Sequence, residues 1–66
     1  MTVEELIEEL KQFPKDLNVV VDGYESGVND IKSPRKIKIR LNANTEWYYG
    51  KHEQDDDGIE AIYISS

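Results

Sequence analysis

The chain has 66 residues, a formal net charge of −6 and no cysteine. A chain this short forms one domain, buries only about 60% of its unfolded surface, and is usually stabilised by disulfides, a structural metal or self-association. The absence of cysteine excludes disulfides and thiolate zinc sites, and a single histidine disfavours any structural zinc. We therefore predict a homo-oligomer without a cofactor.

The same numbers disfavour several functional classes. No apolar stretch approaches the roughly 20 residues that span a bilayer, and the acidic, amphipathic start does not resemble a signal peptide. The negative charge disfavours general nucleic-acid binding, which needs clustered cations. Together with the absence of cysteine, this predicts a cytoplasmic protein that does not bind membranes and has no general nucleic-acid binding.

The N-terminal residues predict an amphipathic helix. Thr2 is suited to cap it, and Glu5 stands three residues later as the partner in a capping box. Pro14 ends the helix because proline disfavours the helical conformation in the residue before it. The apolar residues that follow helical spacing form one stripe: Val3, Leu6, Ile7, Leu10 and Phe13.

Three segments have the composition of strands. Residues 17–22 include three consecutive valines, residues 36–42 alternate apolar with basic side chains, and residues 59–65 are apolar on both faces. A fourth, short strand over residues 46–50 would pair in a hairpin across residues 42–45. We predict one α+β domain, with the helix packed on a mainly antiparallel sheet of three to four strands.

A single short helix covers only one face of such a sheet. The other face would show Val20 with either Ile62 and Ile64 or Ala61 and Tyr63. The cations whose stems lie beside these residues are Lys36, Lys38 and Arg40. An apolar patch rimmed by charge often marks an interface, although long basic stems also cover such surfaces. We predict a partner-binding surface here.

The turn after the first strand is a candidate ligand-binding site. Gly23 and Gly27 lie within five residues, and glycines let backbone amides approach a ligand closely. Successive amides in such a turn can form an anion-binding nest, with Tyr24 and Glu25 beside them. The alternative is an ordinary turn with a packed tyrosine.

Residues 42–58 form a long connection between two predicted strands. Such connections are usually functional or disordered, and three consecutive aromatic residues are unusual in a disordered segment. We therefore expect an exposed, partly ordered loop that contacts another molecule. The candidate binding residues are Trp47, Tyr48, Tyr49, Lys51 and His52. Alternatively, Trp47 and Tyr49 close the open end of a small core.

Residues 52–58 offer weaker chemistry. His52 beside Glu53 could act as a general base in a small metal-assisted hydrolase, but no nucleophile motif accompanies it and position 56 is not histidine. The start of an EF-hand loop is present from Glu53 to Gly58, yet Ile64 stands where a bidentate glutamate is required. We predict no catalytic or metal-binding residue. Asp55, Asp56 and Asp57 are predicted to form a solvated turn with acidic side chains available to a partner.

The order of these motifs resembles a family of short, uncharacterised bacterial and phage or prophage proteins. The matching patterns are T-V-x-E-L-I at the N-terminus, V-V-V-x-G-Y-E-x-G over residues 19–27, and W-Y-Y-G-x-H-E over residues 47–53. The resemblance covers most of the chain. It implies a mobile-element setting, in which small acidic proteins often act by blocking a host defence protein or by sequestering a nucleotide signal.

We therefore expect a non-catalytic binding protein, with counter-defence as its setting. In the first hypothesis, residues 22–27 and 47–53 together hold a small anionic, nucleotide-like ligand. In the second hypothesis, an acidic surface inhibits a host protein and speeds encounter with it through long-range charge. This surface comprises Glu4, Glu8, Glu9, Asp55, Asp56 and Asp57. The third hypothesis is a small metal-assisted hydrolase.

Overall fold

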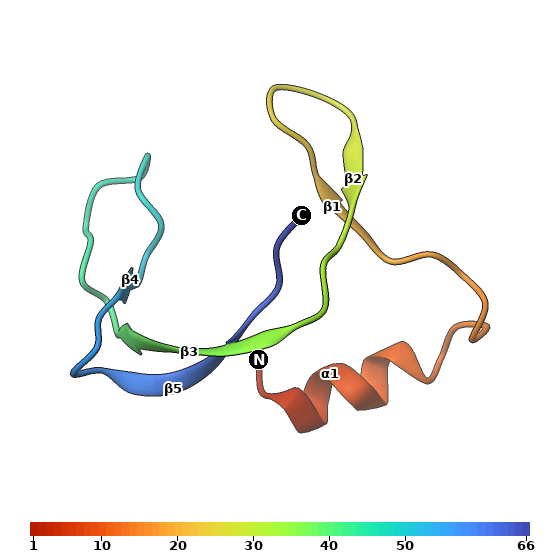
Figure 1. Cartoon of the computed structure of the whole chain (residues 1–66), viewed down its shortest axis with the longest axis horizontal. Helices are drawn as coiled ribbons and strands as arrows, with labels where there is room; N and C mark the ends of the chain where they lie inside the picture. Colours follow the sequence, from red (N-terminus) through yellow and green to blue (C-terminus); the bar gives the residue numbers. More distant parts are fainter. The chain divides into compact units, whose positions relative to one another are not determined.

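The computed structural model describes all of residues 1–66. The elements, in chain order, are α1 (Val3–Leu10), β1 (Val20–Asp22), β2 (Val28–Asp30), β3 (Arg35–Arg40), β4 (Glu53–Gln54) and β5 (Ile59–Tyr63) (Figure 1). One helix with two antiparallel sheets confirms the predicted α+β class. No helix is long and apolar enough to cross a membrane. The chain divides into two compact units, residues 1–32 with 65–66 and residues 33–64, and each is described by itself.

Helix α1 begins with the predicted capping box. The backbone N–H of Thr2 donates to Glu5 Oε1 over 3.0 Å, and the backbone N–H of Glu5 donates to Thr2 Oγ1 over 3.1 Å. The bond from the Thr2 backbone, followed by that from its hydroxyl, lowers the pKa of Glu5 below 4.5. The helix ends at Leu10, four residues before Pro14, so the proline lies in the following turn.

The first unit also contains the hairpin of β1 and β2. Val20 pairs with Asp30 and Asp22 with Val28, which leaves residues 23–27 as the connecting turn. Strand β1 is shorter than the predicted segment 17–22 because β2 offers only three partners. Strand β2 was not predicted, since Asn and Asp are depleted in strands. The two strands form a sheet of their own, so Val20 shares no sheet face with the basic residues of β3.

The second unit contains the sheet in the order β4-β3-β5, in place of one sheet that includes β1. Ile37 lies opposite Ala61 and Ile39 opposite Ile59, so these apolar residues share one face. Arg35 lies over the ring of Tyr63 on that face, 5.1 Å from its centroid. On the opposite face are Lys36, Lys38, Arg40, Glu60 and Ile62. The predicted alternation along β3 and β5 is therefore confirmed, with Ile62 beside the cations.

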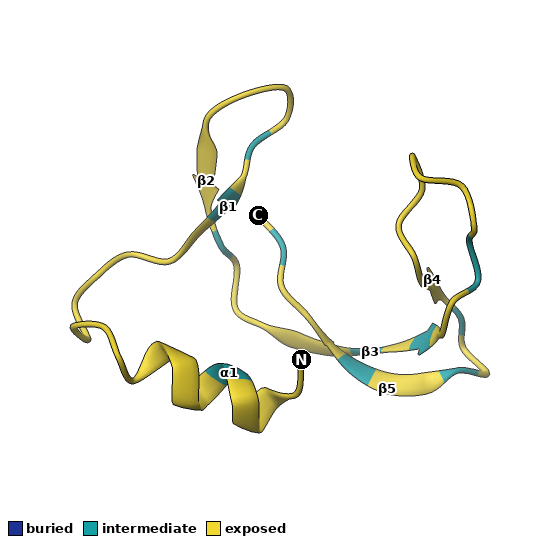
Figure 2. Ribbon diagram, turned by 180° about the vertical axis from the view of Figure 1, so that it is seen from behind, coloured by how far each residue is buried: buried dark blue, intermediate teal, exposed yellow.

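No side chain in the chain is fully buried (Figure 2). The most protected apolar residues are half-buried, and they are spread over both units: Leu6, Val21, Ile31, Ile37, Ile39, Ala43 and Ala61. The other residues of the α1 stripe are more exposed, with Ile7 at 49% and Leu10 at 47%. Neither unit closes a hydrophobic core of its own, so much apolar surface is available for further contacts.

Candidate functional site

Residues 42–53, called the aromatic loop here, leave β3 through a left-handed residue. Asn42 has a φ of 54°, a conformation that asparagine adopts more readily than most residues. Its backbone N–H donates to His52 Nδ1 over 2.9 Å, which ties the first residue of the loop to its end. The contact requires an unprotonated Nδ1, because a protonated nitrogen has no lone pair to accept with.

Asn44 holds the middle of the aromatic loop together. Its side-chain Nδ2 donates to the carbonyl oxygen of Gly50 over 2.7 Å and to Glu53 Oε1 over 2.6 Å. Its backbone N–H donates to the carbonyl oxygen of Lys51 over 3.2 Å. A side-chain amide has two N–H donors, and a carboxylate acceptor strengthens the bond. One residue therefore fixes the returning arm of the loop at three points.

The aromatic residues occupy a turn at the tip of this loop. The backbone N–H of Tyr49 donates to the carbonyl oxygen of Glu46 over 3.1 Å, so residues 46–49 form a β-turn. The prediction of a strand over residues 46–50 is wrong, and the partner of β3 on this side is β4. A local turn outweighs the strand preference of three aromatic residues here.

The three aromatic rings contact one another while remaining open to solvent. The rings of Trp47 and Tyr48 meet edge to face with centroids 5.6 Å apart, and those of Tyr48 and Tyr49 lie tilted at 4.9 Å. Trp47 is 91% exposed, and both tyrosines are about 60% exposed. The alternative in which Trp47 and Tyr49 close a core is therefore wrong. The loop is exposed and hydrogen-bonded, as expected, and its contact with another molecule stays a prediction.

The polar residues of the aromatic loop divide into two groups. His52 and Glu53 accept hydrogen bonds from Asn42 and Asn44, so both side chains are engaged in holding the loop. Lys51 is exposed and has no ion-pair partner within the chain. No sequence pattern indicates the structural roles of His52 and Asn44, although asparagine is a residue favoured in turns.

The turn of residues 23–27 is built from backbone contacts. The N–H of Gly23 donates to the carbonyl oxygen of Gly27 over 3.0 Å, and that of Ser26 to the carbonyl oxygen of Tyr24 over 2.9 Å. Two amides of the expected nest are therefore used within the turn. Glu25 has a φ of 69°, a sparsely populated conformation for a residue with a side chain.

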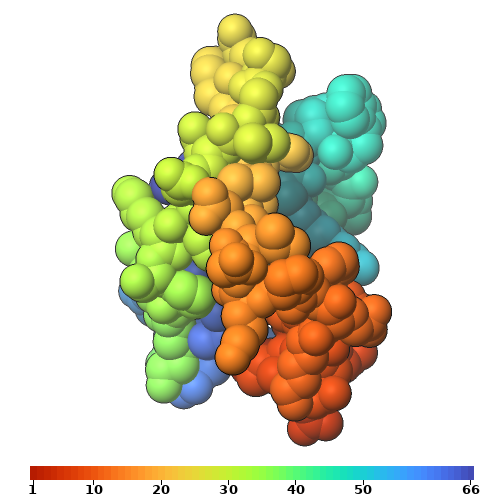
Figure 3. Space-filling view, turned by 90° about the vertical axis from the view of Figure 1, so that its right-hand side faces the viewer, coloured from red at the N-terminus to blue at the C-terminus, as the bar shows by residue number.

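Tyr24 projects from this turn and is 92% exposed, so the expectation of a packed tyrosine is wrong. In the space-filling view the turn, coloured yellow, stands clear of the remainder of its own unit (Figure 3). The turn belongs to the first unit and the aromatic loop to the second. A site that combines the two, as the first hypothesis requires, is not a feature of either unit.

The acidic triplet lies in the predicted solvated turn. Asp55 Oδ1 accepts from the N–H of Asp57 over 2.9 Å, and its carbonyl oxygen accepts from the N–H of Gly58 over 2.8 Å. Asp55 Oδ2 also pairs with Arg40 at 3.5 Å. Asp55 therefore shapes the turn, whereas Asp56 and Asp57 have exposed side chains without ion pairs. No cluster of three or more acidic or histidine side chains is arranged to hold a metal.

The basic strand is also partly neutralised within the chain. Lys36 pairs with Glu60 at 3.3 Å and Arg40 pairs with Asp55, which leaves Lys38 as the cation of β3 without an ion pair on this face. Ile62 lies on the same face, opposite Lys36. Ile64 follows the end of β5.

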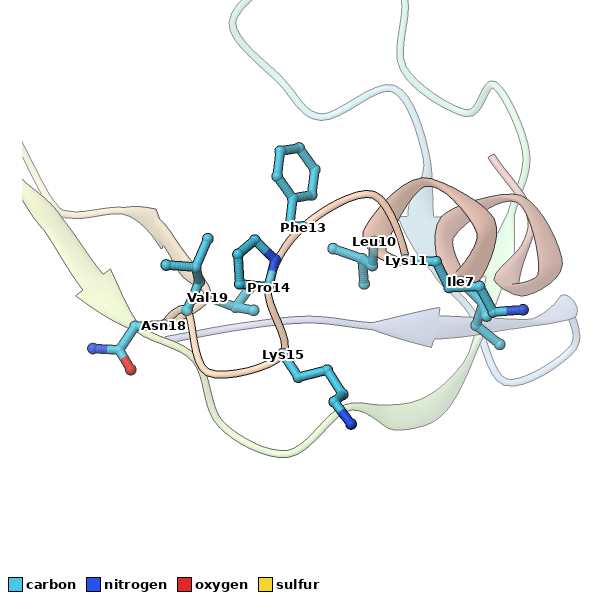
Figure 4. Close-up of a pocket in the computed structure, with 9 residues that line it drawn as sticks. Ile7, Leu10, Lys11, Phe13, Pro14, Lys15, Asn18 and Val19 are labelled. Atoms are coloured by element: carbon cyan, nitrogen blue, oxygen red, sulfur yellow. The ribbon is translucent and has the colours of Figure 1, made fainter.

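An apolar groove lies within the first unit, between α1 and the segment that follows it (Figure 4). The residues that line it are Ile7, Leu10, Lys11, Phe13, Pro14, Lys15, Leu17, Asn18 and Val19. None of them belongs to the predicted ligand-binding set. Its one ion pair joins Lys11 to Glu8 at 3.0 Å on the exposed side of the helix. The groove is formed by the predicted helix stripe and the segment that leads to β1.

Comparisons with known proteins add no assignment: no protein-family model matches the chain, and no curated protein or solved structure matches it. The geometry of the two loops is therefore the basis on which a function can be inferred.

Proposed function

We propose that this is a non-catalytic binding protein whose aromatic loop inserts Trp47 into a pocket on a protein partner. The observation that carries the proposal is the exposure of Trp47 at 91% on a loop that is held by its own hydrogen bonds. Tryptophan and tyrosine dominate the binding energy of protein interfaces, where they fill pockets on the partner.

The shape of the loop favours a protein partner over a small molecule. Small-molecule sites are usually concave and lined by apolar side chains. The aromatic side chains here are exposed on a β-turn, and the apolar groove of the first unit contains none of them. An exposed aromatic turn supports a contact in which the partner provides the pocket.

The fixed loop also supports tight binding. Ordering a flexible side chain or loop on association costs free energy, and a loop already held in its bound form avoids most of that cost. Asn44 and His52 provide this order through four hydrogen bonds. They act as positioning residues, whereas Trp47, Tyr48 and Tyr49 would make the contact.

The resemblance to short phage and prophage proteins supports a host protein as the partner and counter-defence as the setting. The negative charge of the chain would speed encounter with a basic surface, with Asp56 and Asp57 as unpaired contributors. A small homo-oligomer remains part of the proposal, because neither unit closes a core of its own.

The test is affinity capture from a bacterial host lysate with the tagged, full-length chain, quantified by mass spectrometry. The proposal expects one protein that is enriched by the wild type and by Tyr24→Ala, and lost with Trp47→Ala. Tyr24→Ala is the matched control because Tyr24 is equally exposed, at 92%, on the other loop. Equal enrichment by Trp47→Ala and the wild type would contradict the proposal.

A small anionic, nucleotide-like ligand is the second candidate. Lys51 supports it, since this cation has no ion pair within the chain and lies two residues after the Tyr48–Tyr49 pair. Trp47 is the only tryptophan, so its fluorescence reports stacking directly. Titration with adenosine and guanosine triphosphates should quench it in the wild type and not in Lys51→Ala, if this candidate is correct.

A further inference from the structure

The outer edge of β5 is free. In the sheet order β4-β3-β5, no strand lies beyond β5, and the strand is five residues long. A strand at the edge of a sheet presents a row of unpaired N–H and C=O groups, which is a template for pairing with another strand.

The register identifies which backbone groups point outward. The N–H of Asp55 donates to the carbonyl oxygen of Lys38, so Lys38 directs its backbone groups toward β4. Because these directions alternate along a strand, Ile37 and Ile39 direct theirs toward β5. Their partners Ala61 and Ile59 therefore face β3, and Glu60 and Ile62 present their backbone groups at the free edge.

The two edges of this sheet differ in their protection. The part of β3 beyond β4 and Asp55 is flanked by Pro34 and carries Lys36, and both residue types disfavour pairing with another strand. Strand β5 contains no proline, lysine, arginine or glycine, and four of its five residues are apolar. One edge is protected against association, whereas the other has the composition of a strand that pairs.

We propose that a second copy of this chain occupies the free edge, with the two β5 strands antiparallel and Ala61 on the twofold axis. Glu60 then lies opposite the partner subunit's Ile62, and Ile59 opposite the partner subunit's Tyr63. No like charges face each other, and the small Ala61 side chain lies where the two strands approach most closely.

This arrangement also joins the apolar faces of the two sheets. Ile37, Ile39, Ile59, Ala61 and Tyr63 lie on one face of each sheet, so pairing at β5 produces one continuous apolar surface across six strands. Isologous pairing of this kind closes after two copies and leaves the protected β3 edges outermost. The inference rests on the homo-oligomer of the proposed function and is independent of what the aromatic loop binds.

The direct test is disulfide trapping, for which the cysteine-free chain is suited. In the proposed register, Ala61 of the two copies forms a non-hydrogen-bonded pair with Cα atoms about 4.5 Å apart, within the range that a disulfide spans. Ala61→Cys should therefore form a covalent dimer on mild oxidation. Ile59→Cys and Tyr63→Cys are the controls, since each lies about 14 Å from its own copy at four residues of strand rise. Equal cross-linking of all three variants, or trapping of Ile62→Cys in place of Ala61→Cys, would overturn the register.

A second experiment uses proline at two directly paired positions. Ile62→Pro removes an N–H that points outward at the free edge of β5. Lys36→Pro removes the N–H of the residue paired with Ile62 on β3, which points away from β5. Sedimentation equilibrium should give twice the 7.6 kDa chain mass for the wild type and Lys36→Pro, and the chain mass for Ile62→Pro. Far-ultraviolet circular dichroism checks that both variants keep the wild-type fold. A wild type that sediments as a monomer would overturn the proposal.

The same experiments separate this inference from the proposed function. Trp47→Ala should keep the dimer mass while it loses the captured host protein. A monomeric wild type that still captures the protein through Trp47 would contradict the dimer and leave the proposed function in place. A dimer that captures no protein would contradict the role of the aromatic loop and leave the dimer in place.

Discussion

The two exposed loops of this molecule reach similar exposure by different means. Residues 23–27 close through two backbone hydrogen bonds and adopt positive φ angles at Glu25 and Gly27. The aromatic loop closes mainly through side chains, with Asn44 and His52 as its anchors. Each loop presents an aromatic residue that is more than 90% exposed, Tyr24 in one case and Trp47 in the other.

The difference indicates which loop is the better recognition site. A tight backbone turn is a common way to join two strands, and it needs no specific side chain beyond residues that accept positive φ. In the aromatic loop, three polar side chains form the hydrogen bonds that close the loop, so its aromatic rings are held in a defined cluster. We therefore assign recognition to the aromatic loop and regard the hairpin turn as a connection.

The largest effect is expected where the support of the aromatic loop is removed. A Cβ added at Gly58 would clash with the backbone carbonyl of Ile39 and lie 3.0 Å from the carbonyl oxygen of Asp55. Gly58→Ala should lower the stability of the β4-β3-β5 sheet by about 3 kcal/mol, because backbone atoms must move. Urea unfolding measures this, and Gly50→Ala, whose Cβ meets only the His52 carbonyl oxygen at 3.9 Å, should unfold like the wild type.

The second prediction breaks the closure of the aromatic loop itself. Asn44→Asp removes both side-chain donors and places a carboxylate beside Glu53. The loop should lose about 2 kcal/mol of local stability at about 1 kcal/mol for each hydrogen bond. The near-ultraviolet circular dichroism of the aromatic cluster should fall toward that of the unfolded chain. Asn18→Asp, which makes the same charge change in the first unit, should leave the signal intact, and an unchanged signal in both would contradict the role of Asn44.

The third prediction concerns the hairpin turn. Gly27 has a φ of 74° and open space around it, so an added Cβ meets no atom and acts only through the backbone conformation. Gly27→Ala should destabilise the β1–β2 hairpin by about 1 kcal/mol. Chemical shifts of β1 and β2 should move toward random-coil values, while those of the aromatic loop stay in place. A loss of hydrogen bonds in both loops would show that their closure is not independent.

The smallest effect is expected from acid at the helix start. The pKa of Glu5 is lowered by its capping-box bonds with Thr2, so the folded state favours the charged carboxylate. The resulting stability is present above pH 4.5, the ordinary value, and is lost as the pH falls through the lowered pKa. Helicity of the wild type should decline as the pH falls below 4.5, whereas Glu5→Gln should give a flatter profile there, since glutamine keeps the capping contact and does not titrate.

The sequence predicts the regular elements well and the contacts between them poorly. The capping box of Thr2 and Glu5 and the alternation of β3 depend on neighbouring residues, so both could be predicted. Strand β2 and the strand-free turn at residues 46–49 could not, because short strands depend on which partner the chain supplies. Whether β1 joins the larger sheet is likewise set by long-range pairing.

The sequence predicts which aromatic residues form the candidate site, but not the hydrogen bonds that hold them in place. The cluster of Trp47, Tyr48 and Tyr49 is visible in the sequence, and its exposure follows from the length of the connection. The roles of Asn44 and His52 depend on a return of the chain over six to ten residues, which no local pattern specifies. The sequence predicts His52 as a ligand-binding residue of the loop, whereas in the structure its Nδ1 accepts a hydrogen bond from the backbone N–H of Asn42.

Hydrogen exchange of the aromatic loop, followed by NMR in the wild type and Asn44→Asp, shows directly whether the loop is ordered before it binds. An ordered loop should give slow exchange at the backbone amides of Asn42, Asn44 and Tyr49 in the wild type, while Trp47 stays accessible to a soluble fluorescence quencher. In Asn44→Asp these amides should exchange at least about tenfold faster, in line with about 2 kcal/mol of lost local stability. Fast exchange of all three amides in the wild type would contradict a loop that is ordered before it meets a partner.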